Sequence, residues 1–381
     1  MVVTETPPGT PNGFGSMQQN FYQGFSPKLI FTNADFKKEG ESQGFVLGQV
    51  PYHRAGKYIG DFVKGKIPEW RGFFSAKWLK KKISGEIDVV YSFVYSPSTL
   101  LWGHWISIKK RCRHIIHIAD HSKLFFVPKF LNTIKKANSL LVISNRMKIL
   151  YEEKTQRRDI KVFHNFPDNR CFPEDASSMI AKHPFSKSNP LILTFIGGLY
   201  TYLHKDSIED ILNAVSKHHN EGSPIEIHLY GERYPQSFLE EEISQKGIIH
   251  HGLVMPLERK YEIMKKSHAF VIPSSFDHKI NQDYQYSFPA KLTEFIASGK
   301  PVIYYGPNKT AASNFCKKHK GIILIDTKSQ NLIFNTLSRL INDYQNLQSA
   351  SEENSESIKD THSKEIILNN FHNHLLHVIS E

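Results

Sequence analysis

The sequence has few cysteines and no long apolar run, and both absences narrow what the protein can be. Its 381 residues include three widely spaced cysteines, Cys112, Cys171 and Cys316. An odd, scattered set argues against a disulfide framework and against a thiolate metal site, so we expect buried small apolar residues. No stretch of about 18 uninterrupted apolar residues is present to form a transmembrane helix. The segment MVVTETPPGT lacks the features of a signal peptide, which predicts a cytoplasmic protein.

Positive charge is what the sequence has in excess. The formal net charge of +11 at pH 7 favours an anionic partner, whether nucleic acid, a membrane surface or a phosphorylated substrate. Charge alone does not choose among these. Because the sequence shows no RNA-binding signature, zinc module or helix-turn-helix pattern, we predict no nucleic-acid partner.

Short apolar runs that end in Gly, Ser, Asn or Asp recur along the chain. In the second half they lie at 191–198, 225–232, 268–275, 301–307 and 321–326, and in the first half at 2–7, 28–33, 87–93, 114–120, 139–144 and 160–165. Runs without alternation are typical of strands buried on both faces. Amphipathic segments such as 207–220 lie between them. This order predicts parallel sheets with helices on both faces.

The length and the repeated pattern predict two domains of similar architecture. We place the first, Rossmann-like domain at 1–170, a linker rich in Pro, Ser and Asn at 171–190, and the second Rossmann-like domain at 191–355. A polar stretch at 349–365 precedes a terminal helix, and we expect 356–381 to pack back on the first domain. Two such sheets facing a central cleft would bind a ligand at the carboxyl ends of their strands.

The segment YSFPAKLTEFIASGKPVIYYGP, at 286–307, points to that ligand. We expect Ser287 to cap a helix at 288–297 that Gly299 ends, with its N-terminus at the strand ends. Uncapped N–H groups there favour a phosphate. Lys291 and Glu294 share one helix face, so a cation beside a phosphate and a carboxylate able to accept from ribose hydroxyls would together hold a nucleotide.

These residues carry a family resemblance. SFPAKLTEFIASGKPVI resembles the donor-binding segment of the family 4 glycosyltransferases with the GT-B architecture, which share a Pro, a Lys-Leu, a Glu and an A-x-G-x-P-V-I close. The resemblance extends to LTFIGGLY, HKDSIEDILNAV, IHLYGE and HHGLVMPLERKYEIMKKSHAFVIPSS, and in the first half to LVISNRMKILYEE and VFHNFPD. It covers most of the second domain and little of the first.

The resemblance implies an enzyme that transfers a hexose-like sugar from a nucleotide-diphosphate donor, with retention of anomeric configuration and without a required metal or other cofactor. It implies that Glu294 binds the ribose hydroxyls and Lys205 the diphosphate. The remaining donor-binding candidates in the second domain are Gly197, Gly198, Tyr230, Gly231, Tyr286, Ser287, Phe288 and Lys291. Amides and a cation at these positions would stabilise the charge that builds on the leaving diphosphate.

Two positions depart from the family's pattern. Tyr286 stands where many members have a second glutamate, and Gly198 stands where an arginine is often found. An alternative is therefore a catalytically degenerate GT-B protein that acts as a partner or scaffold. A sugar-nucleotide epimerase shares the architecture, but the sequence lacks a clear acidic catalytic set.

In the first domain, Gly13 and Gly15 lie where a helix opens after the first strand, and their amides are candidates for the donor diphosphate. The alternative is an ordinary turn and helix start. Asp120 and His121 end the strand HIIHIADH, where the family places a polar residue that touches the transferred sugar. The histidines at 114, 117 and 121 invite a metal interpretation. Strand alternation would place only His117 and His121 on the same face, and no third ligand or carboxylate joins them, so we predict no metal site.

Aromatic and basic residues alternate at 69–85, EWRGFFSAKWLKKKISG. Such a helix suits the headgroup region of an anionic bilayer, with 107–114 extending the basic surface. The alternative is a core helix with solvated lysines. Membrane docking would place the protein at the inner face of the membrane and favour a lipid-linked acceptor or a cell-surface polysaccharide precursor.

Overall fold

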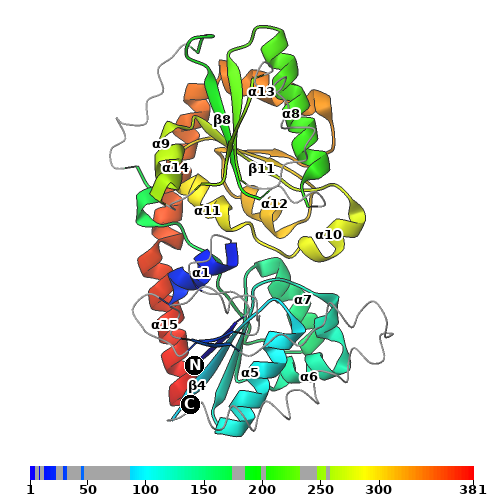
Figure 1. Ribbon diagram of the computed structural model, residues 1–381, viewed down its shortest axis with the longest axis vertical. Helices are drawn as coiled ribbons and strands as arrows, with labels where there is room; N and C mark the ends of the chain where they lie inside the picture. The colour runs from blue at the N-terminus through cyan, green and yellow to red at the C-terminus, as the bar shows by residue number, and fades with distance from the viewer. Residues whose placement is uncertain are drawn as a thin grey trace. The chain divides into compact units, whose positions relative to one another are not determined.

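The computed structural model describes residues 1–4, 8, 13–22, 29–31, 44–46, 86–173, 185–198, 203–231, 247–254 and 258–381. The chain forms two compact units, whose elements can be followed in Figure 1. The first unit comprises Met1–Asn165, Tyr286–Phe288 and Ile367–Glu381, and the second comprises Phe166–Gln285 and Pro289–Ile366.

The first unit contains a parallel sheet of seven strands in the order β3-β2-β1-β4-β5-β6-β7. The strands are β1 (Val2–Thr4), β2 (Leu29–Phe31), β3 (Gly44–Val46), β4 (Val89–Val94), β5 (Arg113–Ile118), β6 (Ser139–Val142) and β7 (Lys161–Val162). β4 and β5 are buried beyond their first residues, as their unbroken apolar runs predict. The three-residue β3 was not predicted, because it is too short to show a period.

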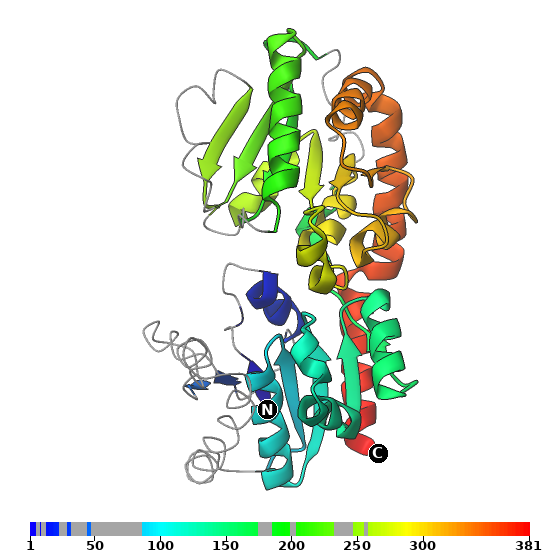
Figure 2. The same ribbon diagram turned by 90° about the vertical axis from the view of Figure 1, so that its right-hand side faces the viewer.

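Helices cover both faces of this sheet. They are α1 (Gly13–Phe21), α5 (Pro97–Lys110), α6 (Pro128–Lys136), α7 (Asn145–Thr155) and α15 (Lys364–Ser380), with a 3₁₀ turn, η2, at Lys123–Phe126. Val90 of β4 packs with Trp102 of α5 on one face. The next residue, Tyr91, packs on the opposite face against Phe371 of α15, at 5.6 Å between ring centroids. Figure 2 shows α5 and α15 on the two sides of the sheet.

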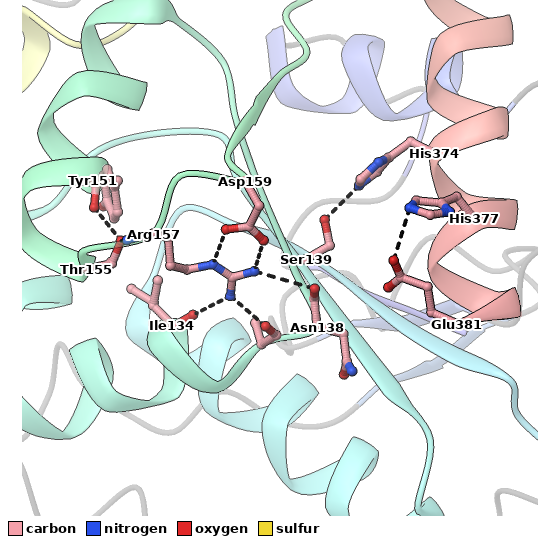
Figure 3. A network of polar contacts seen from close by, with 11 residues as sticks. Ile134, Asn138, Ser139, Tyr151, Thr155, Arg157, Asp159, His374, His377 and Glu381 are labelled. Atoms are coloured by element: carbon pink, nitrogen blue, oxygen red, sulfur yellow. Dashed lines mark hydrogen bonds and ion pairs between the residues drawn. The ribbon is translucent and has the colours of Figure 1, made fainter.

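Polar contacts fix α15 and the end of α6 in the first unit (Figure 3). His374 of α15 shares a 2.7 Å hydrogen bond with the Ser139 hydroxyl at the start of β6. Arg157 donates to the backbone carbonyls of Ile134 and Ala137 and pairs with Asp159. A cation at the last carbonyls of α6 stabilises that helix end.

The second unit contains a parallel sheet of six strands in the order β10-β9-β8-β11-β12-β13. The strands are β8 (Leu191–Ile196), β9 (Ile225–Tyr230), β10 (Ile248–Gly252), β11 (Ala269–Pro273), β12 (Val302–Tyr305) and β13 (Ile322–Ile325). The helices are α8 (Lys205–Asn220), α9 (Glu258–Lys266), α10 (His278–Tyr284), α11 (Ala290–Ala297), α12 (Ala311–Cys316), α13 (Gln330–Asn342) and α14 (Tyr344–His362), with a 3₁₀ turn, η3, at Asn169–Cys171.

The core of the second unit lies on both sides of its sheet. Leu212 of α8 and Leu337 of α13 are buried with Val271 of β11 on one face, where the two helices run side by side (Figure 1). The preceding residue, Phe270, stacks on Phe295 of α11 at 4.3 Å between ring centroids. Because successive strand residues face opposite ways, α11 covers the other face.

The polar stretch at 349–365 is largely helical, which the sequence pattern did not indicate. Most of it belongs to α14, whose buried face carries small polar residues. Ser355 donates a 2.6 Å hydrogen bond to the Ala297 carbonyl at the end of α11, and Ser351 donates to the Gly321 carbonyl at 3.3 Å. Because these serine hydroxyls donate to backbone carbonyls, the helix packs closely against its neighbours at these positions. A continuous apolar stripe, from which an amphipathic helix is recognised in a sequence, is therefore absent.

Candidate functional site

The carboxyl ends of β8 and β9 meet through two glycines that the sequence marked as donor-binding. A Cβ atom at Gly231 would stand 1.8 Å from the Gly197 carbonyl oxygen, so only glycine fits there. The Gly197 amide donates to the Tyr230 carbonyl and the Gly231 amide donates to the Gly252 carbonyl, each at 2.8 Å. The strand ends therefore present bare backbone at one edge of the sheet, as close approach of a ligand requires.

The helix α11 begins later than predicted. It starts at Ala290, and its N-cap residue, Pro289, makes no side-chain capping hydrogen bond. The prediction that Ser287 caps the helix was wrong, because its hydroxyl donates a 2.5 Å hydrogen bond to the Asp120 carboxylate instead. Gly299 ends the helix in the left-handed conformation, with φ +67, as predicted. The positive end of a helix dipole remains a favourable place for an anion.

Lys291 directs its ammonium group to the glycine at the end of β8. A Cβ built at Gly197 would lie 3.0 Å from Lys291 Nζ. Burial lowers the pKa of Lys291 to about 8, the Glu294 charge acts against this, and the Lys260 charge adds to it. Lys291 also lowers the pKa of neighbouring His204, which falls to about 4 chiefly through burial. Among the described residues, Lys291 has no ion-pair partner.

Glu294 is paired with a lysine that the sequence did not single out. Its carboxylate is 5% exposed, and Oε1 accepts a 2.8 Å hydrogen bond from Lys260 Nζ of α9. The other oxygen, Oε2, has no hydrogen-bond partner in the described ranges. The two charges three residues apart on α11 thus point to different groups, Lys291 to Gly197 and Glu294 to Lys260.

The remaining candidates of the second unit are Tyr230 and Gly198, which lie at the carboxyl ends of β9 and β8, and Lys205. Tyr230 ends β9, and its ring stacks on His251 at 4.4 Å between centroids. Gly198 directly follows Gly197 beyond the end of β8. Lys205 is the first residue of α8, but its side chain lies outside the described residues.

The tripeptide Tyr286–Phe288 belongs to the first unit, where it contacts the predicted polar residues Asp120 and His121. Asp120 accepts from the Ser287 hydroxyl and from the His121 amide, the latter at 3.0 Å. The Tyr286 ring meets the His121 ring edge-on at 4.8 Å between centroids. Phe288 stacks on His164 at 4.6 Å between centroids. Asp120, His121, Tyr286 and Ser287 therefore form one cluster, and Phe288 packs on His164.

The three histidines near β5 have separate partners. Buried His114 shares a 2.9 Å hydrogen bond with the Ser92 hydroxyl, and buried His117 shares one of 2.6 Å with the Tyr91 hydroxyl. His121 lies 3.3 Å from the Tyr151 hydroxyl. His117 is thus a structural residue, as predicted. In the part of the chain that the structure describes, no group of three His, Cys, Asp or Glu residues could hold a metal ion.

Three further predictions have simpler outcomes. Gly13 and Gly15 lie within the first turn of α1, so they open a helix as expected, and Gly15 is buried. The aromatic and basic segment 69–85 lies outside the described residues. Cys171 and Cys316 are buried as predicted, whereas Cys112 is only half-buried.

Sequence reasoning missed Lys260, Ser144, Tyr151 and His164. Lys260 stands four residues before buried Met264, so it shares a face with the apolar stripe of α9, which is the one available signal. Ser144 caps α7 and donates a 2.7 Å hydrogen bond to the Tyr286 carbonyl. No sequence pattern predicts that contact, because its partners are far apart along the chain.

The chain is similar to known proteins in sequence and in structure. Residues 190–343 match the family described as glycosyl transferases group 1. The chain is similar in structure to HepE of Anabaena in complex with UDP and glucose, with a TM-score of 0.68, 13% identity and 98% of each chain covered. It is also similar to the sucrose-phosphate synthase of Thermosynechococcus elongatus, with a TM-score of 0.68, 12% identity and coverage of 100% of this chain and 99% of that one.

A glycosyltransferase of Rickettsia africae gives a TM-score of 0.65 at 11% identity, over 99% of this chain and 98% of that one. The sequence has no match among curated proteins. At these identities the structural likeness shows the fold, and it confirms the predicted pair of parallel-sheet α/β domains. No helix in the described ranges is long and apolar enough to cross a membrane.

Proposed function

We propose that this chain, which has the GT-B fold and a region similar to glycosyl transferases group 1, is a glycosyltransferase that moves a hexose from a nucleotide-diphosphate donor to a hydroxyl acceptor with retention. The second unit would bind the donor without a required metal, and the first unit would bind the acceptor. The family match over 190–343 and the bound UDP and glucose in the similar HepE structure support the donor class.

One observation carries the proposal: among the described residues, α11 holds a carboxylate oxygen without a hydrogen-bond partner and an ammonium group without an ion-pair partner. Glu294 Oε2 has no partner among the described residues, and Lys291 Nζ lies beside the bare backbone of Gly197. A carboxylate oxygen can accept from a ribose hydroxyl, and an ammonium can neutralise a phosphate. A nucleoside diphosphate is a ligand that needs both.

The chemistry follows from where charge develops. When the glycosidic bond breaks, its electron pair stays with the nucleotide diphosphate, which becomes the leaving group. Lys291 and the positive end of the α11 dipole would stabilise this negative charge, and Lys205 at the start of α8 would add a second cation. The departing phosphate would then assist the incoming hydroxyl on the same face of the sugar, which gives retention.

In the first unit, we propose that Asp120 and His121 contact the transferred sugar or the acceptor. His121 is 8% exposed, and the Asp120 carboxylate is held by Ser287. The net charge of +11 favours an acidic acceptor. We propose that this acceptor is a lipid-linked or polysaccharide precursor at the inner face of the membrane.

The test is a thermal-shift screen against UDP, GDP, ADP, CMP and their sugar conjugates without added metal, because a ligand that binds only the folded state raises the melting temperature. We expect one nucleoside diphosphate to give a clear shift. Glu294→Ala should weaken its binding by about 1–3 kcal/mol through loss of charge-assisted hydrogen bonds. Glu356→Ala, on the exposed side of α14, is the matched control and should bind normally.

The anomeric configuration of the product, read by NMR after transfer to an acceptor, tests retention. A folded protein that shifts with no nucleotide and transfers no sugar would overturn the proposal. That outcome would favour a degenerate GT-B scaffold, the interpretation to which Tyr286 and Gly198 point.

A further inference from the structure

The ion pair between Lys260 and Glu294 links two helices of the second unit. Lys260 comes from α9 and Glu294 from α11, and their side chains are 11% and 6% exposed. Burial lowers the pKa of Lys260, but the charges of Glu294, Cys171 and Tyr261 outweigh it, so the net pKa is raised. Lys260 is therefore charged at neutral pH, in a place where a charge is costly to bury.

The geometry of this pair differs from that of a stabilising salt bridge. Only Oε1 of Glu294 is engaged, at 2.8 Å, and Oε2 keeps its lone pairs without a partner in the described part of the chain. A buried pair repays its desolvation only when the remaining lone pairs are also satisfied. Half of this carboxylate is thus held firmly, and the other half is left for a hydrogen-bond donor.

Other cations nearby do not supply this contact. Lys291 lies one turn earlier on α11, but its ammonium is directed to Gly197. Lys300, just beyond α11, donates to the backbone carbonyls of Met264, Lys265 and Ser267. Lys260 alone, among the described lysines, contacts Glu294.

We propose that Lys260 is a positioning residue, which fixes the Glu294 carboxylate so that Oε2 accepts from a ribose hydroxyl of the nucleotide donor. This role rests on the proposed function. Lys260 would act through Glu294 and would not itself contact the nucleotide. Lys260 also neutralises Glu294, so that a carboxylate can stand close to a bound diphosphate without repelling it.

The experiment compares the dissociation constants of UDP and 2′-deoxy-UDP by calorimetry, because their ratio isolates the ribose contact. We expect the wild-type protein to prefer UDP by about 10-fold or more, the value of a charge-assisted hydrogen bond. Lys260→Met should bring the ratio close to one, and Glu294→Ala should do the same. Lys260→Arg should restore much of the preference, since it keeps the charge.

The matched control is Lys266→Met on the exposed side of α9, which should leave both affinities unchanged. Breaking a buried pair destabilises a fold, so circular dichroism and melting temperature accompany each variant. If Lys260→Met fails to fold, Lys260→Gln keeps a neutral donor and should give an intermediate ratio.

Two failures are distinguishable. A wild-type protein that binds no nucleotide overturns the proposed function, and the role of Lys260 falls with it. A wild-type protein that prefers UDP, together with a folded Lys260→Met or Lys260→Gln variant that keeps the full preference, overturns only the positioning role. In that case Lys260 serves stability alone.

Discussion

Lys291 should make nucleotide affinity depend on pH in a range where few other groups titrate. Burial lowers the pKa of its ammonium to about 8, and the group lies beside Gly197 at the proposed diphosphate position. A diphosphate binds the charged form, so affinity is full below this pKa and is lost as pH rises through it. Phosphate ionisation, near pH 6, is complete over this range.

The magnitude follows from the fraction of protein that carries the proton. With a pKa of about 8, that fraction falls from roughly nine tenths at pH 7 to roughly one tenth at pH 9, so affinity should weaken by about 10-fold, or about 1.4 kcal/mol. Calorimetric titration of UDP at pH 7, 8 and 9 measures this directly.

Two variants separate the cause from other pH effects. Lys291→Arg keeps its charge across the range, so its affinity should be flat. Lys291→Met should bind weakly at every pH, also without a slope. A wild-type profile that is flat between pH 7 and 9, or a Lys291→Met variant that binds as tightly as wild type, would refute the assignment of Lys291 to the diphosphate.

Three further predictions concern stability. Burial lowers the pKa of Lys300 to about 7, so the folded state releases a proton that the unfolded chain holds until about pH 10.4. Stability should rise with pH through that window, and Lys300→Met should reduce the rise in melting temperature between pH 7 and 9, leaving the part that Lys291 contributes. Gly321→Ala should cost roughly 1–3 kcal/mol in urea unfolding, because its Cβ would stand 2.6 Å from Ser351 Cα, and an unchanged midpoint would contradict the close packing of α14. Phe371→Ala should cost about 3–5 kcal/mol and expose α15 to proteolysis, whereas Ile379→Ala, 40% exposed, should do neither; equal protection in both variants would argue against the aromatic contact.

Much of the fold follows from patterns that are local in sequence. Both parallel sheets were predictable because strands buried on two faces leave apolar runs without alternation, as in β4 and β8. β10 escaped prediction, since two isoleucines precede two exposed histidines and no period develops. α14 escaped because small polar residues, among them Ser351 and Ser355, interrupt the apolar positions on its buried face. A hydrophobicity pattern does not reveal helix packing that depends on hydrogen bonds from serine side chains to backbone carbonyls.

The candidate site was predictable only where motif residues carry their own geometry. Gly197, Lys291 and Glu294 lie at or near the sheet edge that the sequence indicated. The partner of Glu294 and the partners of Tyr286–Phe288 were not predictable, because they come from other elements and the contacts arise only in the folded chain. The sequence therefore indicated which side chains are chemically suitable, and the structure shows which of them are already engaged.

The discontinuous first unit has a consequence for synthesis. Its aromatic core needs Phe371, which packs against Phe21 at 4.7 Å and Phe163 at 5.5 Å between ring centroids. A ribosome delivers that residue only after the whole second unit has been made. The unit that begins first is thus completed last, and in the interval an apolar aromatic face stands open to chaperones or to aggregation.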